Sequence, residues 1–318
     1  MEDRNKPDTK FEFTATASRG TEDALVTELR HIGLQKVQTG QGAVTFSGPL
    51  RDGYRACIWS RVASRVLVKC LRQTARDADE LYAVAKTVPW EAHIAKGATF
   101  AVRFVGKSKT IRDTRFGGLV VKDAVVDRLR ELRGERPSVD AKTPDVMIHV
   151  HLAHANATIY IDLSGDPLHI RGDGGRIDGP APIRENLAAA MLIMFDWPRR
   201  AREGQCLVDP FCGSGTIVLE AAGMALHHAP GLARSRWGFM GWSGHDEKVW
   251  KGVISDAESK AMDAEESDLL FVGSDIDDRA VHASNDNARR LGLRGVTRFF
   301  TQDAALVEPP RRSDAVFG

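Results

Sequence analysis

The sequence predicts an α/β fold in which an open, Rossmann-like parallel sheet follows smaller α+β units. In the C-terminal third, short apolar runs of strand length alternate with helical patterns, which is typical of βαβ units. In the N-terminal half, alternating strand patterns are separated by glycine-containing turns and amphipathic helices. With 318 residues, the chain is long enough for about two domains or more, at ~150 residues each.

Residues 11–76 are predicted to form the first α+β unit, behind a polar tail, residues 1–10, that we expect to be disordered. Residues 11–16 alternate like a strand. Residues 20–32 have the spacing of a helix, and Gly33 fits its C-terminal stop. The other expected elements are strands at 36–39 and 43–46, a helix at 50–60 and a basic strand at 62–73.

Residues 77–168 are predicted to form the second α+β unit. Residues 79–88 suit a helix that Pro89 would end, and residues 99–105 alternate like a strand. Residues 116–133 have the pattern of a long amphipathic helix. A hairpin of strands 146–152 and 157–163 follows, and residues 169–182 form a linker to a final domain at 183–318.

Composition narrows the protein class. The chain is 42% hydrophobic and 27% charged, as in ordinary soluble globular proteins. No apolar run approaches the ~18–20 residues of a bilayer span, so no membrane partner is expected. The four cysteines lack C-x-x-C spacing, which favours a reducing, cytoplasmic location over a structural zinc site. His149, His151 and His154 alternate like strand residues, so no metal is expected there either.

Charge is unevenly distributed along this nearly neutral chain. Residues 51–130 hold 17 Lys and Arg against 8 Asp and Glu, whereas residues 201–318 hold 13 against 18. The basic block predicts a polyanionic partner for the first part of the chain, although a solvated charged face would give the same count. The loop at residues 107–115 concentrates positive side chains next to hydroxyls that can also donate to phosphate.

The most informative motif lies at residues 209–216, between an apolar strand at 206–208 and a helix at 217–222. This layout of strand, tight glycine turn and helix is that of a cofactor loop at the carboxyl end of a parallel strand. A P-loop would need a lysine, and a dinucleotide fingerprint would need a third glycine; both are absent. Asp209 before the glycines suits a sulfonium with an amino-acid tail better than a pyrophosphate.

Two further acids follow later strands of the same predicted sheet. Asp275, with Asp277 as second candidate, ends a strand within 269–277 and is expected to accept hydrogen bonds from ribose hydroxyls. Asp303 follows the strand at 296–300 and is expected to accept from an adenine amine. Taken singly, each acid fits a helix cap or a solvated loop residue better, and only their series behind Asp209 favours the cofactor role.

Residues 209–216 resemble motif I of the class I S-adenosylmethionine (SAM) methyltransferases. Residues 78–165, with the basic loop and the run at 161–172, resemble the THUMP domain, an RNA-binding module. Over residues 11–318 the chain is similar to bacterial large-subunit rRNA guanine-N2 methyltransferases of the RlmL type. The similarity also covers residues 16–20, 59–65 and an insert containing 229–232, 236–239 and 241–242.

The resemblance implies an incomplete Rossmann-like class I methyltransferase sheet preceded by ferredoxin-like and THUMP domains. It implies SAM as cofactor and 23S ribosomal RNA, before full assembly, as partner. The implied cofactor residues are Asp209, Pro210, Phe211, Cys212, Gly213, Ser214, Gly215, Thr216, Asp275 and Asp303. The expected RNA contacts are Arg61, Arg65, Lys107, Lys109, Arg112, Arg115, Lys122 and Arg171.

The sequence departs from this family at its last residues. The resemblance implies that an Asn-Pro-Pro-Tyr loop after the fourth strand holds the guanine. The fourth strand is expected at 314–317, Gly318 is the last residue, and no Asn-Pro-Pro-Tyr occurs elsewhere. We therefore assign no catalytic residue and expect the chain as written to be inactive, with SAM binding weakened by an exposed sheet edge.

Other interpretations stay open from the sequence. The chain could be an RNA-binding protein with a vestigial methylase half, or a DNA or protein amino-methyltransferase, which the basic block argues against. Glu185 and Asn186 could line the methionine end of SAM or serve as capping residues. The insert aromatics Trp237, Phe239, Trp242 and Trp250 could stack on bases or form a satellite core.

Overall fold

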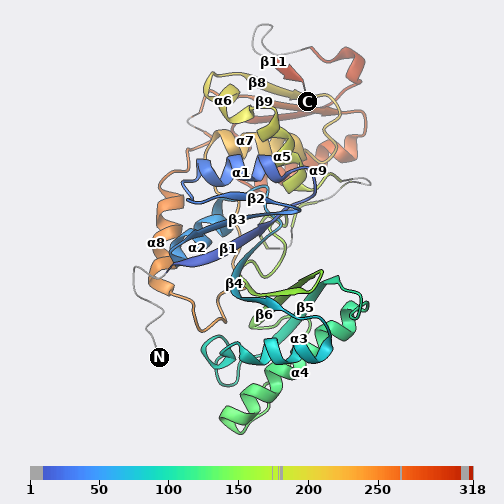
Figure 1. Ribbon diagram of the computed structural model, residues 1–318. Helices are drawn as coiled ribbons and strands as arrows, with labels where there is room; N and C mark the ends of the chain where they lie inside the picture. The colour runs from blue at the N-terminus through green and yellow to red at the C-terminus, as the bar shows by residue number, and fades with distance from the viewer. Residues whose placement is uncertain are drawn as a thin grey trace.

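Two β-sheets organise the molecule. The computed structural model describes residues 10–173, 175–177, 179, 182–265 and 267–308, and the backbone of 315–317. A seven-stranded mixed sheet occupies the N-terminal half and a four-stranded parallel sheet lies at the opposite end (Figure 1). This confirms the predicted α/β fold. The expected disordered tail lies, apart from Lys10, outside the described residues.

The seven-stranded sheet runs through both predicted α+β units, in the order β2-β3-β1-β4-β7-β6-β5. The central strand β4 pairs antiparallel with β1 through residues 65–68 and with β7 through residues 67–74. The predicted boundary after residue 76 therefore does not separate two sheets. The strands are β1 (Phe11–Thr16), β2 (Gln38–Gly40), β3 (Ala43–Gly48), β4 (Arg65–Thr74), β5 (Phe100–Lys107), β6 (Val146–Ala153) and β7 (Asn156–Asp162).

The helices of this half begin and end at residues that suit helix termini. Asp77 accepts a hydrogen bond from the backbone N–H of Glu80 at 2.9 Å, and Asp113 caps the next long helix through Arg115 N–H at 2.8 Å. Gly134, at φ +69°, ends that helix in the left-handed region. The helices are α1 (Glu22–His31), α2 (Leu50–Trp59), α3 (Ala78–Thr87) and α4 (Thr114–Arg133).

The C-terminal sheet is parallel, in the order β10-β9-β8-β11. Its strands are short, and β8 and β9 are buried as the apolar runs predict, whereas β10 is mostly exposed. The carboxyl ends of these parallel strands meet at one edge. Within the described ranges, no helix is both long and apolar enough to cross a membrane. The elements are β8 (Cys206–Asp209), β9 (Phe271–Asp275), β10 (Thr297–Thr301), β11 (Ala315–Phe317), α5 (Glu185–Met194), α6 (Trp197–Arg202), α7 (Thr216–Ala225) and α9 (Asp278–Arg290).

The insert after α7 folds back onto the N-terminal half. Its helix α8 (Glu247–Glu258) packs against α2, and its aromatic rings surround Tyr54. The Tyr54 ring lies 4.6 Å from Phe239 and 5.5 Å from Trp250, centroid to centroid. Trp237, Phe239, Trp242 and Trp250 are each at most 4% exposed, so they form core and are not available to stack on RNA bases.

The insert also contacts the second α+β unit. Trp242 Nε1 donates to His93 Nδ1 at 2.8 Å, and Arg234 donates to the Ser164 carbonyl at 3.0 Å. Gly238 lies so close to the segment that follows β7 that an added Cβ would be 2.5 Å from the backbone nitrogen of Gly165. The insert thus joins the parallel sheet to the N-terminal half through close backbone packing.

Replacing Gly238 by alanine is expected to lower the free energy of unfolding by about 1–3 kcal/mol, because the added methyl must displace rigid backbone. Urea denaturation followed by circular dichroism measures the change. Gly252→Ala on α8 is the matched control, because nothing lies within 4 Å of its Cβ position. That control should be neutral or stabilising by up to about 1 kcal/mol. Equal effects of the two substitutions would contradict the tight contact.

Candidate functional site

The loop after β8 is a tight turn at the carboxyl edge of the parallel sheet. Asp209 ends β8, is 4% exposed, and accepts a hydrogen bond from Phe211 N–H at 3.0 Å. Gly213 and Gly215 have φ values of +53° and +83°, in the region that glycine adopts readily. A Cβ at Gly215 would also lie 3.1 Å from Ser284 Oγ. Glycine adopts this sharp turn without steric cost, and at Gly215 the close approach of Ser284 also leaves little room for a side chain.

The strand β9 holds the loop in place through Asp275. One carboxylate oxygen accepts from Gly213 N–H at 3.0 Å, and the other accepts from Asp277 N–H at 2.9 Å. Cys212 N–H donates to the Ser274 carbonyl at 2.9 Å, next to this contact. The structure thus brings Asp209 and Asp275, which are far apart in the sequence, to one edge of the sheet.

Two residues of α9 that sequence reasoning missed also support the loop. Ser284 Oγ donates to the Gly213 carbonyl at 2.8 Å, and Asn287 Nδ2 donates to the Ser214 carbonyl at 3.1 Å. Asn287 also exchanges two hydrogen bonds with the backbone of Ile177. Both side chains are at most 1% exposed. Polar residues three positions apart on the apolar face of a predicted helix were the available signal.

The electrostatics of this edge favour a cationic ligand. Burial raises the pKa of Asp209, and the negative charge of Asp275 raises it further. Among the described residues, neither carboxylate is paired with Lys or Arg. Burial also raises the pKa of Cys212 to about 12, so its thiol stays neutral and is a poor nucleophile at neutral pH.

The third predicted acid lies beside the same edge. Gln302 N–H donates to the Asp275 carbonyl at 3.0 Å, and Asp303 accepts from Ala305 N–H at 2.9 Å. Asp303 thus caps a short helical turn, and its adenine contact stays a prediction. Phe211 and Ile276 are each 76% exposed after β8 and β9 and offer apolar surface to a ligand at this edge. Ile276 was missed because exposure cannot be read from an isolated isoleucine.

The remaining acid and amide candidates have structural partners. Asp277 caps α9 through Arg279 N–H at 2.9 Å. Glu185 Oε1 lies 3.7 Å from Arg176 Nε, and Asn186 donates to Ser64 Oγ at 3.1 Å. The contact with Ser64 ties α5 to the N-terminal half, and a contact of Glu185 or Asn186 with cofactor remains a prediction.

Three of the predicted RNA contacts are buried in ion pairs, which corrects that expectation. Glu220 of α7 pairs with Arg61 at 2.8 Å and with Arg171 at 3.0 Å. Arg65 pairs with the fully buried carboxylate of Asp162. Arg61, Arg65 and Arg171 are 7–8% exposed and cannot reach phosphate without breaking these pairs. The sequence shows that these residues are positively charged, but it does not show which carboxylates they pair with.

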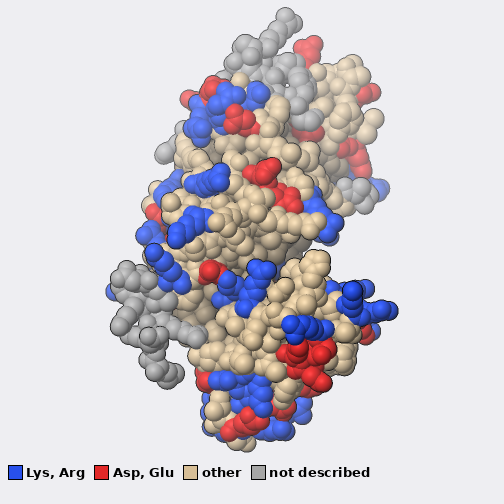
Figure 2. Space-filling view, viewed as in Figure 1, with Lys and Arg blue, Asp and Glu red and all other residues tan. Residues whose placement is uncertain are grey.

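The basic loop between β5 and α4 is exposed. Ser108 closes it, because its hydroxyl accepts from Ile111 N–H at 3.0 Å while its own N–H donates to the Ile111 carbonyl. Figure 2 shows Lys and Arg side chains at the right-hand edge of the lower half, where β5 leads into α4. A groove of about 420 Å³ beside this loop is lined by Arg115 and Lys122, and Lys122 also pairs with Asp123. Lys107, Lys109, Arg112 and Arg115 are the exposed members of the predicted set.

Across the part of the chain that the structure describes, no group of three or more His, Cys, Asp or Glu is arranged to hold a metal ion. His149 instead lies on β6, where burial lowers its pKa to about 4 and nearby Arg65 and Arg103 lower it further. Its imidazole is therefore neutral at neutral pH.

Three family models match consecutive parts of the chain. They are the RlmL ferredoxin-like domain at residues 12–67, the THUMP domain at 75–162 and the RMKL-like methyltransferase domain at 175–317. The third match contains the loop after β8 and all three carboxylates of the carboxyl edge. The second contains the exposed basic loop.

Whole-chain comparisons agree with these matches. The chain is 43% identical over 293 residues to the ribosomal RNA large subunit methyltransferase K/L of Syntrophotalea carbinolica, covering 92% of this chain and 41% of that protein. It thus spans about two fifths of that relative. A predicted N6-adenine-specific DNA methylase from Listeria monocytogenes superposes with a TM-score of 0.84 at 31% identity, covering 97% of this chain and 78% of that one. A candidate methyltransferase complexed with SAH has the same TM-score at 29% identity, and the match covers 97% of this chain and 80% of that one. The chain therefore belongs to the RMKL-like methyltransferases that carry RlmL ferredoxin-like and THUMP domains.

Proposed function

We propose that this protein takes part in methyl transfer from SAM to the exocyclic N2 amine of a guanine in large-subunit (23S) ribosomal RNA. The observation that carries the proposal is the loop at 209–216, held by Asp275 beside a buried, unpaired carboxylate, in a chain that also presents an exposed basic loop. The rRNA methyltransferase relative and the neighbour complexed with SAH support it.

The chain's own residues would bind and orient the cofactor. Asp209 would face its positive charge, Asp275 would accept from the ribose hydroxyls and Asp303 from the adenine amine. When bound, SAM supplies an electrophilic methyl group. The neutral thiol of Cys212 leaves direct transfer to the RNA amine as the simplest course.

Guanine N2 is a poor nucleophile because its lone pair is delocalised into the ring. The base must leave its stack and be held in line with the methyl group while its amine donates to fixed acceptors. Ribosomal RNA that is not yet fully assembled allows that movement most readily, so the proposed reaction precedes complete assembly, and the proposed location is the cytoplasm. We assign no base-holding residue within residues 1–318, where no Asn-Pro-Pro-Tyr occurs.

Two measurements test this function. Calorimetric titration with S-adenosylhomocysteine and filter binding of 23S rRNA against duplex DNA at equal salt test both binding steps without turnover. Incubation with tritiated SAM and unmodified 23S rRNA, followed by nucleoside analysis, tests the transfer. N2-methylguanosine is the expected product of the transfer, and residues 1–318 by themselves, which contain no Asn-Pro-Pro-Tyr, are expected to form none. Because one structural neighbour is a predicted N6-adenine-specific DNA methylase, N6-methyladenine in DNA is the second candidate and would replace the first.

The basic loop gives a prediction for RNA affinity. Lys109→Gln combined with Arg112→Gln should weaken 23S rRNA binding about tenfold near 0.1 M salt and reduce the salt slope by about 1–2, because each removes a phosphate contact. Filter binding over a salt series measures both quantities. Lys248→Gln combined with Lys251→Gln on α8 removes the same charge from another exposed surface. An equal loss in this control would assign the effect to net charge instead of the loop.

A further inference from the structure

A cavity of about 500 Å³ lies between the N-terminal half and the parallel sheet, away from the loop at 209–216. Arg202 and Gly204 of its lining precede β8, and Ser267 and Leu269 precede β9. The cavity is therefore at the amino ends of these strands, whereas the proposed cofactor edge is at their carboxyl ends. The four residues of β8 separate the two edges by on the order of 13 Å.

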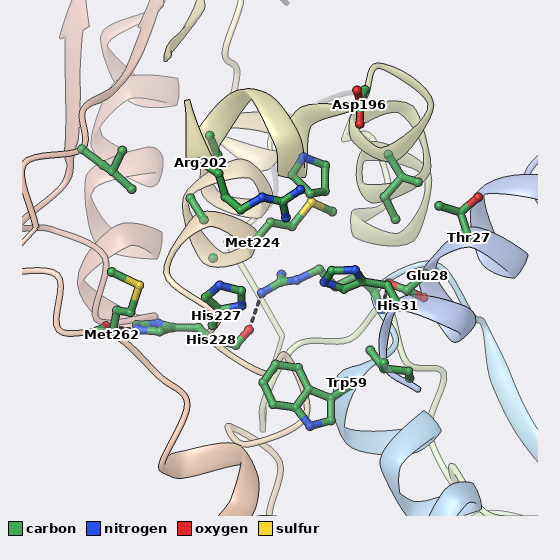
Figure 3. A pocket seen from close by; sticks show the side chains of 18 of the residues that line it. Thr27, Glu28, His31, Trp59, Asp196, Arg202, Met224, His227, His228 and Met262 are labelled. Carbon is green, nitrogen blue, oxygen red and sulfur yellow. Dashed lines mark hydrogen bonds between the residues drawn. The ribbon is translucent and has the colours of Figure 1, made fainter. Parts of the chain in front are cut away.

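The cavity has an apolar wall that includes one aromatic ring. Figure 3 shows Trp59 of the N-terminal half facing Met224 of α7 across this space, with Met262 to one side. Trp59 is half-buried, and Lys260, which pairs with Asp256, lies 5.8 Å from its ring centroid. The volume of the cavity falls within the range of small-molecule sites. The flexible side chains of methionines adapt to ligands of different shapes.

One guanidinium and two imidazoles, which can all donate N–H groups to an anion, converge on the same cavity from three segments. His31 ends α1, Arg202 ends α6, and His227 follows α7 (Figure 3). Partial burial lowers the pKa of His227, and nearby Arg202 and Lys260 lower it further, so its imidazole is neutral at neutral pH and can donate one N–H. Among the described residues, neither His31 nor Arg202 forms an ion pair.

The two carboxylates in the lining are engaged by other groups. Glu28 accepts hydrogen bonds from Ser60 Oγ and from the backbone N–H groups of Arg61 and Val62. Asp196 pairs with Arg199. Among the described residues of the lining, Arg202 is therefore a guanidinium without a carboxylate partner, beside an aromatic and thioether wall.

The backbone at His227 decides which substitution can test its imidazole. His227 has φ +52°, a left-handed conformation that is uncommon for non-glycine residues. It stands directly after the last turn of α7, where glycine is the usual residue. The His227 side chain lies beside the cavity, and a replacement must tolerate this left-handed conformation.

We propose that this cavity binds an organic anion with a flat apolar body, the chemistry of a nucleoside monophosphate, either free or as an unpaired nucleotide of RNA. Trp59 would stack on the base, and His31, Arg202 and His227 would surround the phosphate. The site lies apart from the proposed cofactor edge, and its binding does not depend on methyl transfer.

Isothermal titration with guanosine 5′-monophosphate, in saturating S-adenosylhomocysteine, tests the site. Binding is expected, and guanosine or inorganic phosphate alone should bind at least about tenfold more weakly, because each lacks one half of the recognition. His227→Asn, which tolerates the left-handed backbone, and Arg202→Gln should each weaken binding about five- to tenfold. Both residues are exposed, so folding should be retained. Trp59→Leu should weaken binding about tenfold through lost stacking.

His154→Asn is the matched control, because His154 is also an exposed left-handed histidine, at φ +57° in the β6–β7 turn. It should leave binding unchanged. A single-stranded oligoribonucleotide that displaces guanosine monophosphate identifies RNA as the source, and failure to displace it identifies the free nucleotide. No binding at millimolar ligand, or binding that the cavity variants leave unchanged, would overturn the proposal.

Discussion

Replacing Glu220 by glutamine is expected to lower the free energy of unfolding by about 3–5 kcal/mol, because it leaves two buried guanidinium groups without a counter-charge. The Glu220 carboxylate accepts from Arg61 Nη1 at 2.8 Å and from Arg171 Nε at 3.0 Å. Both arginines also donate to backbone carbonyls, so neither can turn easily toward water. Chemical denaturation followed by tryptophan fluorescence measures the loss.

The effect should depend on pH in a defined direction. Burial alone would raise the pKa of Glu220, but the charges of Arg171 and Arg61 more than offset it and hold the pKa below its ordinary value of 4.5. A lowered pKa in the folded state contributes stability that is present above pH 4.5 and lost as the pH falls through the folded value. The difference between the native chain and Glu220→Gln should therefore shrink below about pH 4.5.

Glu203→Gln provides the control for this result. Glu203 pairs with Arg199 at 2.6 Å, but both side chains are about half exposed, at 47% and 49%. Such a surface pair contributes at most about 1 kcal/mol, so its loss should be small at every pH. A loss of equal size in both variants would show that burial of the Glu220 cluster carries no special stability.

Replacing Asp275 by alanine is expected to weaken S-adenosylhomocysteine binding about 100-fold. The substitution removes the acceptor of the Gly213 and Asp277 N–H groups and the proposed acceptor of the ribose hydroxyls. Hydrogen bonds to a charged group contribute about 1.5–3 kcal/mol each, and about 2.7 kcal/mol corresponds to 100-fold in affinity. Isothermal titration calorimetry measures the dissociation constant directly.

Asp277→Asn is the matched control on the same segment. Asp277 caps α9 through Arg279 N–H, and asparagine caps a helix about as well as aspartate. Its affinity should stay close to that of the native chain. Circular dichroism of both variants separates loss of the site from loss of the fold. Native affinity in a folded Asp275→Ala variant would contradict the role assigned to this carboxylate.

Local patterns were sufficient to predict most elements of the fold. Residues 11–16 alternate cleanly and form β1, and residues 116–133 fall within α4, since strand and helix periodicities are written in consecutive residues. The shared sheet was not predictable in the same way. The shared sheet depends on β4, which pairs with β1 through residues 65–68 and with β7 through residues 67–74. Such pairing joins residues that are far apart in the sequence, so no local pattern specifies it.

The sequence by itself determined the glycine turn at 209–216 and the basic loop, because each is a contiguous run whose chemistry follows from residue type, and it located the acids that end or follow strands of the parallel sheet. Only the tertiary structure decided which charges are free. Arg61, Arg65 and Arg171 looked like RNA contacts but lie buried against Glu220 and Asp162, while the insert aromatics form core. The physical reason is that burial and ion pairing depend on which distant segments meet, and no local pattern contains that information.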